Sequence, residues 1–292
     1  MSFSSDHLEE LAAAAIDAAT QAGSIIAERT GGDLKVALKS DREDRAAQVL
    51  TEVDGLSQTC ILEVLEPTTA RFDLGLLAEE SSDDHSRFEK EAFWCIDPLD
   101  GTLPFIEGDP GYAVSIALVG KDGTPLIGVI YDPRSATLYH AIHDTGAFRN
   151  NAQWNPLGAS TKGDSLRFLN DRSFANHALY RNTLEAFEAF ARERGYAKVE
   201  TQLQGGAAMN AIWALENASA CYLKFPNADG GGSLWDYAAT ACIYREAGAI
   251  AEDFFGKPFE LNRSKSTFMN HRGVIFATDR DIAALAKTLD PQ

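Results

Sequence analysis

The segment "FWCIDPLDGTLPF" at positions 93–105 constrains the fold of this chain more than any other stretch. Its first four residues, Phe93–Ile96, are apolar and predict a buried strand, so Asp97 should emerge at the carboxyl end of that strand. Pro98 cannot continue a regular strand, and Gly101 frees the backbone for a tight turn. The sequence therefore predicts a buried strand that runs directly into an acidic turn.

A helix that begins at Thr102 would point its free N–H groups into the space beside this turn. Such groups attract a phosphate, whereas the carboxylates of Asp97 and Asp100 repel it. A bridging cation resolves the conflict, and Mg²⁺, which prefers oxygen ligands and phosphate oxygens, fits best. A calcium loop of the EF-hand type is excluded, because Leu99 and Gly101 occupy its third and fifth positions. An acidic turn without any ligand stays open as the alternative.

Two further stretches also place acidic residues at the end of an apolar run or at the start of a helix. "GLLAEESS" carries Glu79 and Glu80 at the end of an apolar run, and "LWDYAATACI" contains Asp236 at the start of a helix of small residues. In isolation, each stretch also suits a solvated carboxylate or a helix N-cap. With the Asp97 turn, they form an ordered series of three acidic motifs.

The first half of the chain has helix signals followed by strand signals. Helices are predicted over residues 6–29 and from about Leu50 to Glu66, where Pro67 ends the second helix. Turn residues separate several of the strand signals, which favours a largely antiparallel sheet. The strand signals are "FDLGLLA", "FWCI", "YAVSIALVG", "PLIGVIYDP" and "ATLYHAI".

The pattern changes after about residue 160, where short strands and helices alternate along the chain. This alternation favours an α/β layer packed beside the first region. We expect an N-terminal α+β lobe, residues 1–160, with most of the metal ligands. A C-terminal α/β lobe, residues 161–292, would carry Asp236 and the substrate-specificity residues, and the cleft between the lobes would hold the site.

Composition narrows the class of protein. Of 292 residues, 45% are apolar and 24% are charged, as in ordinary soluble globular proteins. The net charge of −17 argues against a broad basic face for nucleic-acid polymers or anionic membranes. The N-terminus does not resemble a signal peptide, and no segment is apolar enough to span a membrane. Four scattered cysteines without a CxxC pair are typical of free thiols in a reducing compartment, so we expect a cytoplasmic protein.

The three acidic motifs resemble, in order, the signature of the inositol monophosphatase superfamily. They are Glu79-Glu80-Ser81, Asp97-Pro98-Leu99-Asp100-Gly101-Thr102 and Trp235-Asp236-Tyr237-Ala238-Ala239. Further segments similar to family segments are Leu50–Asp54, Gly128–Pro133 and Gly205–Asn210. The resemblance covers most of the chain. It implies a layered α-β-α-β-α sandwich like that of the fructose-1,6-bisphosphatases, and a Mg²⁺-dependent, lithium-sensitive phosphomonoesterase.

The resemblance also implies metal ligands. Glu79, Asp97 and the carbonyl of Leu99 would bind one Mg²⁺ ion. Asp97, Asp100 and Asp236 would bind a second ion, and a third, looser ion would lie on Glu79 and waters. Two or three ions are therefore expected.

Catalytic and substrate-binding roles follow from the same resemblance. Asp54 and Thr102 would orient and deprotonate the attacking water, with Glu79 acting beside them through the metal. Backbone N–H groups at the turn would bind the phosphate, and the helix that begins near Gly205 could touch the rest of the substrate. The candidate substrate contacts are Gly101, Thr102, Asp100, Gly205, Ala207 and Lys224.

The sequence leaves the substrate open. Inositol monophosphatases typically have a glutamate near the position of Lys224, whereas bisphosphate nucleotidases of the CysQ type tend to have a basic residue. Lys224 could attract a second anionic group, or it could be a solvated lysine; Ala207–Asn210 resembles the inositol monophosphatase version instead. Inositol phosphates and 3′-phosphoadenosine 5′-phosphate are the leading substrates.

Two other functions stay possible: a sugar phosphatase like the fructose-1,6-bisphosphatases, and a non-catalytic, metal- or phosphate-binding regulatory member of the fold. The chain could be a monomer or a homodimer. The roles of Glu80 and of the Gly230–Gly232 stretch also stay open.

Overall fold

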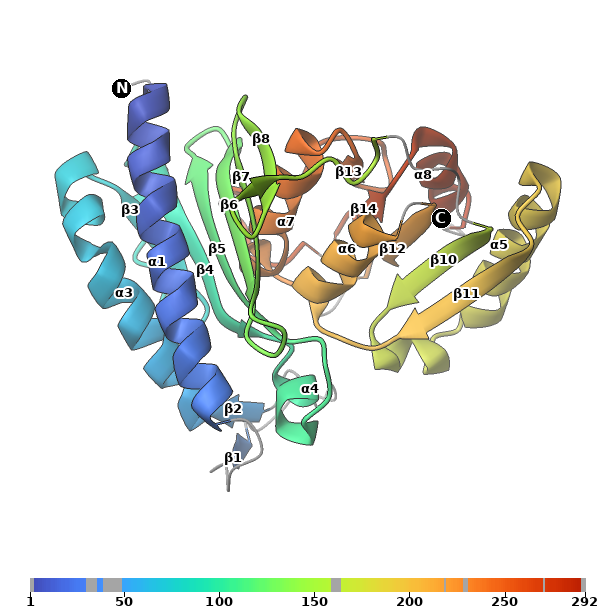
Figure 1. The fold of residues 1–292 in the computed structure, drawn as a ribbon, viewed down its shortest axis with the longest axis horizontal. Helices are drawn as coiled ribbons and strands as arrows, with labels where there is room; N and C mark the ends of the chain where they lie inside the picture. Colours follow the sequence, from blue (N-terminus) through green and yellow to red (C-terminus); the bar gives the residue numbers. More distant parts are fainter. Residues whose placement is uncertain are drawn as a thin grey trace.

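The computed structural model describes residues 3–29, 36–38, 49–158, 164–217, 219–227, 231–269 and 271–289. Its elements form five layers in the order α-β-α-β-α, which is the predicted sandwich (Figure 1). Two sheets enclose one layer of helices, and a further pair of helices covers the outer face of each sheet.

The first layer consists of α1 (Ser5–Arg29) and α3 (Glu52–Phe72), which pack on each other and on the first sheet. The sequence of α1 is amphipathic, and its buried side faces β5 and β6. Gly23 permits this close approach, because an added Cβ would lie 2.2 Å from the ring of Tyr131 on β6. The prediction of a helix over residues 6–29 is confirmed.

Helix α3 runs through Pro67, so the predicted end of this helix at Glu66 is wrong. A proline inside a helix lacks the N–H that would bond to the carbonyl four residues earlier, here that of Glu63. Glu63 and Pro67 both lie on the exposed side of α3, where water can satisfy that carbonyl. The opposite side buries Leu65, and this packing carries the helix through the proline.

The first sheet has seven strands in sequential order, and every pair is antiparallel except β3 with β4. The predicted, largely antiparallel sheet is therefore confirmed. The strands are β3 (Gly75–Ala78), β4 (Ala92–Asp100), β5 (Ala113–Gly120), β6 (Pro125–Asp132), β7 (Thr137–Ile142), β8 (Gly146–Arg149) and β9 (Ala152–Gln153).

Strand β4 does not end at Ile96, as the sequence predicted, but continues to Asp100 with one irregularity. Asp97 pairs with Ser115 and Asp100 with Ala113, so one extra residue bulges out of β4 between the two aspartates. Pro98 lies in this bulge, where its missing N–H interrupts the regular ladder. Residues three apart in a regular strand point to opposite faces of the sheet, so the extra residue allows both aspartates to contribute to one cluster.

The middle layer is formed by α6 (Ala207–Glu216) and α7 (Leu234–Glu246), and α7 packs on β5, β6 and β7. The second sheet has the order β11-β10-β12-β14-β13, with β10 parallel to both of its neighbours. Its strands are β10 (Ser165–Asn170), β11 (Lys198–Leu203), β12 (Ala220–Lys224), β13 (Ile250–Glu252) and β14 (Val274–Ala277). Helices α5 (Tyr180–Arg194) and α8 (Arg280–Lys287) cover its outer face.

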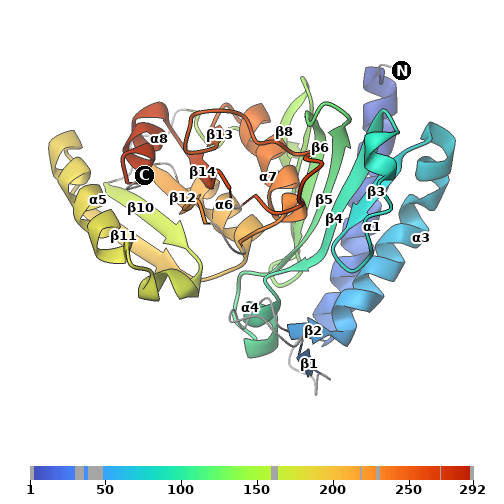
Figure 2. The ribbon, with the colours of Figure 1, turned by 180° about the vertical axis from the view of Figure 1, so that it is seen from behind.

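Short elements complete the chain. They are the pair β1 (Val36–Leu38) and β2 (Val49–Thr51), the helix α4 (Thr102–Glu107), and the 3₁₀ helices η1 (Ser86–Phe88) and η2 (Arg172–Asn176). Seen from behind, the segment before β14 reaches across to the first sheet (Figure 2). It connects the two halves near the start of β3 and the start of α7.

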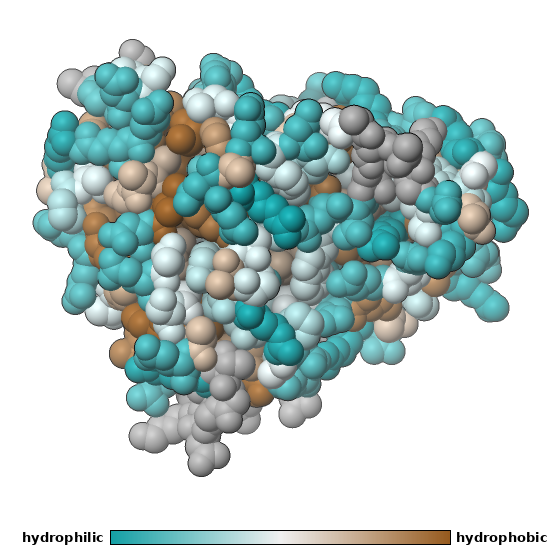
Figure 3. Space-filling view, viewed as in Figure 1, coloured by the Kyte–Doolittle hydropathy of each residue, from teal (hydrophilic) through white to brown (hydrophobic). Residues whose placement is uncertain are grey.

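Hydrophilic residues cover most of the face in Figure 3, and the apolar residues visible on it gather mainly beside α1. Among the large hydrophobic residues of the described ranges, Leu56 and Phe255 are the exposed ones. No helix in the described part of the chain is long and apolar enough to cross a bilayer. Apolar side chains are thus concentrated between the layers.

Candidate active site

Three aspartates from distant parts of the chain converge. Asp97, Asp100 and Asp236 offer carboxylate oxygens that all lie within 4.8 Å of one another. The first two come from the bulged end of β4, and the third comes from the first turn of α7. Asp97 is 2% exposed and Asp100 is 6% exposed. Like charges at this separation repel strongly where little water screens them.

The pKa values of all three aspartates are raised, with burial as the largest cause. Burial, followed by repulsion from Glu79, Asp100 and Asp236, raises the pKa of Asp97 well above its usual value. Burial and repulsion from Asp236 raise the pKa of Asp100 to about 7, and burial raises the pKa of Asp236 to about 6. These three carboxylates therefore lack enough positive charge around them in the protein alone.

Glu79 and Asp54 border this group. Glu79 follows β3 and its N–H donates to the carbonyl of Ile96 on β4 at 3.1 Å. Although Glu79 is exposed as a residue, desolvation by the protein atoms around its carboxylate, followed by the charges of Asp236 and Glu80, raises its pKa to about 8. Asp54, which is 4% exposed, adds a smaller repulsion from the first turn of α3.

One face of α3 holds both acidic turns in position. The Ser57 hydroxyl donates to the carbonyl of Pro98 at 2.7 Å. The Gln58 side chain accepts from the N–H of Glu80 at 3.0 Å and donates to the Ser81 hydroxyl at 2.9 Å. Sequence reasoning missed these two residues.

The signal that could have found them is their spacing. Residues three and four positions after Asp54 share its face of the helix, so polar Ser57 and Gln58 point to the same space.

Gly101 and Thr102 form the turn after the bulge. Gly101 has a φ of 86°, and a Cβ there would meet the carbonyl oxygen of Gly111 at 2.5 Å, so glycine is required. Thr102 is the first residue of α4, and its hydroxyl donates to the carbonyl of Leu99 at 3.4 Å. The Leu99 N–H in turn donates to Asp97 at 3.0 Å.

Gly205 and Ala207 lie at the start of α6, next to Asp100. The two oxygens of Asp100 accept from the N–H groups of Ala207 at 3.0 Å and Ala208 at 2.8 Å. A Cβ on Gly206 would lie 2.3 Å from this carboxylate, so only glycine permits the contact. Asp100 thereby ties the first sheet to the middle layer.

Lys224 ends β12 and forms an ion pair with Asp171. Its charge also opposes the rise in the pKa of Asp100 and Asp236, so the ammonium lies on the same side of the molecule as these carboxylates. The sequence did not predict a partner for Lys224.

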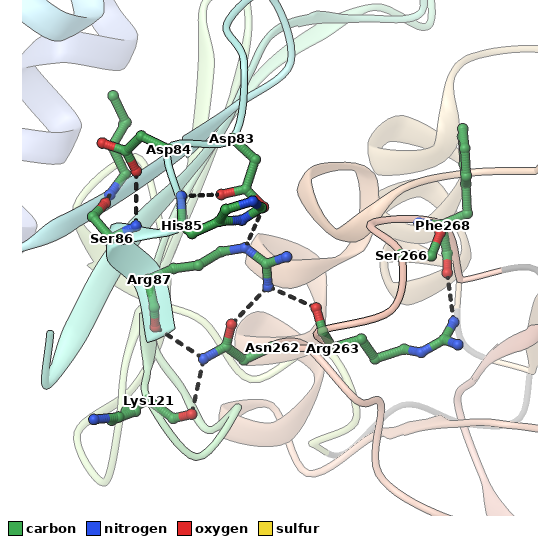
Figure 4. A network of polar contacts seen from close by, with 11 residues as sticks. Asp83, Asp84, His85, Ser86, Arg87, Lys121, Asn262, Arg263, Ser266 and Phe268 are labelled. Carbon is green, nitrogen blue, oxygen red and sulfur yellow. Dashed lines mark hydrogen bonds and ion pairs between the residues drawn. The ribbon is translucent and has the colours of Figure 1, made fainter. Parts of the chain in front are cut away.

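A buried arginine, which lies against the start of β3, joins the two halves of the molecule (Figure 4). Arg87 is 2% exposed and donates to Asp83 at 2.8 Å, to Asn262 at 2.7 Å and to the carbonyl of Arg263 at 2.9 Å. Asn262 donates back to the carbonyl of Arg87 at 3.1 Å and to that of Lys121 at 2.9 Å. The segment after Glu79 is thus attached to the segment that adjoins the start of α7.

Comparison with known proteins decides the family. A family model described as the inositol monophosphatase family matches residues 7–290. The chain belongs to the inositol monophosphatase family. Nus factor SuhB of Pasteurella multocida is 31% identical over 255 residues, which cover 83% of this chain and 84% of that protein. Inositol monophosphatase 1 of Solanum lycopersicum is 28% identical over 267 residues, or 90% of this chain and 91% of that protein.

Solved structures agree with this assignment. The crystal structure of the extragenic suppressor protein suhB from Bartonella henselae matches with a TM-score of 0.73 and 25% identity. The match covers 96% of this chain and 98% of that structure. As a member of the inositol monophosphatase family, the chain is a phosphoric monoester hydrolase.

The site fits the metal dependence of the inositol monophosphatase family. Its donors are carboxylate oxygens, which hard divalent cations such as Mg²⁺ prefer. Burial raises the pKa of all three carboxylates, and repulsion adds to the rise for Asp97 and Asp100, so a divalent cation among them would favour their charged forms.

Proposed function

We propose that this chain hydrolyses small phosphate monoesters with two or three Mg²⁺ ions. The convergence of Asp97, Asp100 and Asp236 within 4.8 Å carries the proposal. Glu79 and the carbonyl of Leu99 would complete the ligand set. When bound, the ions supply positive charge that neutralises phosphoryl oxygens and lowers the pKa of a water.

The chain's own residues position the reactants. The backbone N–H groups of Gly101 and Thr102 donate to phosphate oxygens and hold the ester against the turn. The Thr102 hydroxyl and the Asp54 carboxylate orient one water for in-line attack, and Asp54 accepts its proton. Asp100 keeps its geometry because two N–H groups of α6 hold both of its oxygens. The leaving alkoxide takes a proton from solvent.

In this proposal, residues 1–160 supply most ligands, and residues 161–292 supply Asp236 and the contacts to the rest of the substrate. The substrate is a small metabolite, either an inositol phosphate or 3′-phosphoadenosine 5′-phosphate. Gly205, Ala207 and Lys224 lie on the side where its non-phosphate part would bind. Inhibition by Li⁺ and a cytoplasmic location belong to the same proposal.

Phosphate release from both esters, with and without Mg²⁺ and Li⁺, tests the proposal. We expect hydrolysis of at least one ester that requires Mg²⁺ and falls when Li⁺ is added. Hydrolysis that persists at full rate in excess chelator would contradict the metal roles assigned to Asp97, Asp100 and Asp236.

A second candidate comes from the relatives named Nus factor SuhB, whose name is not that of an enzyme. A non-catalytic member of the fold would still bind Mg²⁺ through the same carboxylates. Binding of Mg²⁺ by calorimetry, without hydrolysis of any small phosphate ester, would favour this candidate over the phosphatase.

A further inference from the structure

Asp171 and Lys224 meet where two parallel strands end. In the pairing of β10 with β12, Arg167 lies opposite Ala220 and Leu169 lies opposite Tyr222. Two residues further along the same register, Asp171 comes opposite Lys224, and their side chains form an ion pair. The pair is therefore a direct consequence of the sheet topology.

The Asp171 carboxylate is held rigidly. Asn170, which is fully buried, donates to the carbonyl of Leu223 at 2.7 Å and accepts from the Asp171 N–H at 2.9 Å. One oxygen of Asp171 accepts from the Ser173 hydroxyl at 2.6 Å and from the Phe174 N–H at 3.2 Å. Its other oxygen remains for Lys224. Moving Asp171 away from the lysine would break several bonds at once.

Arg172, the residue after Asp171, also pairs with carboxylates of the chain. Arg172 donates to Glu107 at 2.5 Å and to Asp109 at 3.2 Å, both at the end of α4. Lys224 and Arg172 therefore each face a carboxylate of the chain. A second phosphate group on the substrate would have to approach Lys224 against the negative charge of Asp171. Hydroxyl groups carry no such penalty, because they can accept from Lys224 and donate to Asp171.

We propose that Asp171 is a specificity-determining residue, and that its ion pair with Lys224 selects a neutral, hydroxyl-bearing group over a second phosphate in the substrate. The inference rests on the proposed phosphatase function and reverses what Lys224 alone suggested. The preferred substrate class is then a polyol monophosphate.

The test compares kcat/KM for inositol 1-phosphate with kcat/KM for 3′-phosphoadenosine 5′-phosphate at saturating Mg²⁺. Two variants remove the charge: Asp171→Asn, and Asp171→Ser, which keeps a residue able to cap η2. Asp281→Asn is the matched control, because it removes an aspartate that pairs with Arg194 on the outer layer of the same sheet. Thermal melting confirms that each variant is folded.

We expect the unmodified protein and Asp281→Asn to prefer the monophosphate. In a folded Asp171 variant, the ratio should move towards the bisphosphate by about tenfold or more, because Lys224 is then free to bind an anion. A preference of the unmodified protein for the bisphosphate, or an unmoved ratio in both variants, would overturn the inference. Hydrolysis of neither ester by the unmodified protein would overturn the proposed function itself, and this inference with it.

Discussion

The protein buries charge in two regions, and the surroundings of the charge differ between them. Arg87 is 2% exposed, and its guanidinium donates to a carboxylate, an amide oxygen and a carbonyl of the chain. Asp97 is equally buried, yet other carboxylates surround it. In one region the polypeptide itself supplies the opposite charge, whereas in the other we propose that a cation supplies it.

We expect the Arg87 network to contribute to stability and the aspartate cluster to contribute to function. A buried charge with its partners in place locks two segments together, and removing either partner is costly. Buried charges of one sign lower the free energy of unfolding until a ligand neutralises them. Relief of this repulsion then adds to the free energy of ligand binding. The two regions should therefore respond oppositely to mutation.

The largest expected effect is on stability, at Arg87. Arg87→Met leaves the partly buried Asp83 and the side-chain oxygen of Asn262 without their donor, and should lower the free energy of unfolding by about 3 kcal/mol. Denaturant unfolding measures this. Arg245→Met is the matched control, because that arginine is exposed and should change stability by less than about 0.5 kcal/mol. Equal losses in the two variants would show that the Arg87 network contributes nothing special.

The next effect is on catalysis, at Asp100. Asp100→Asn should reduce kcat at least about a hundredfold, roughly 2.7 kcal/mol, because it removes a charge needed to hold the metal. In excess chelator, the same variant should be as stable as the unmodified protein or more stable, because repulsion is relieved.

Asp253 provides the contrast to Asp100. It is 2% exposed and bonds to Arg272 and to two backbone N–H groups. Asp253→Asn should lose about 1–3 kcal/mol of stability while the folded variant keeps its kcat. Near-normal turnover by Asp100→Asn at saturating Mg²⁺ would remove the metal assignment.

The third largest expected effect is the loss of stability when the metal is removed. At a Mg²⁺ concentration about 100 times Kd, the ion should stabilise the protein by about 2.7 kcal/mol relative to chelator. Differential scanning fluorimetry should then show an increase in Tm of several degrees, about 2–4 °C per kcal/mol. Asp100→Asn should show little of this increase. An equal increase in that variant would place the stabilising ion elsewhere.

The smallest effect concerns His140, a buried titratable group without an ion pair among the described residues. Its ring stacks on Phe148 with centroids 4.8 Å apart, and burial lowers its pKa. A histidine with a lowered pKa contributes stability above its unfolded pKa of about 6.5 and loses it as the pH falls.

Between pH 7 and 5, the unmodified protein should therefore lose more stability than His140→Phe, which keeps an aromatic ring for the stack. Melting temperatures at the two pH values give the comparison. Identical pH dependence in both proteins would mean that His140 stays neutral or becomes protonated without cost.

Local patterns indicated the separate acidic turns, whereas their grouping into one site came from the resemblance to the inositol monophosphatase superfamily. The apolar run before Asp97, the glycine at Gly101 and the small residues after Asp236 each reflect a requirement of the nearby backbone. The antiparallel sheet and the α/β layer beside it were predictable from the strand and helix signals, whereas the order of the five layers followed from the family resemblance.

What could not be predicted depends on contacts between distant residues. Pro67 continues a helix because it faces water, and Arg87 finds its partner Asn262 only after the sheets are packed. The pairing of Lys224 with Asp171 depends on which strands are neighbours. Local propensity carries no information about such neighbours.

Anomalous X-ray diffraction from crystals soaked in Mn²⁺, a stand-in for Mg²⁺ with the same oxygen ligands, would locate the divalent ion in the protein. We expect a strong anomalous peak among the carboxylates of Asp97, Asp100 and Asp236, and no such peak in Asp100→Asn. The absence of a peak between these residues in the unmodified protein would contradict the metal assignment.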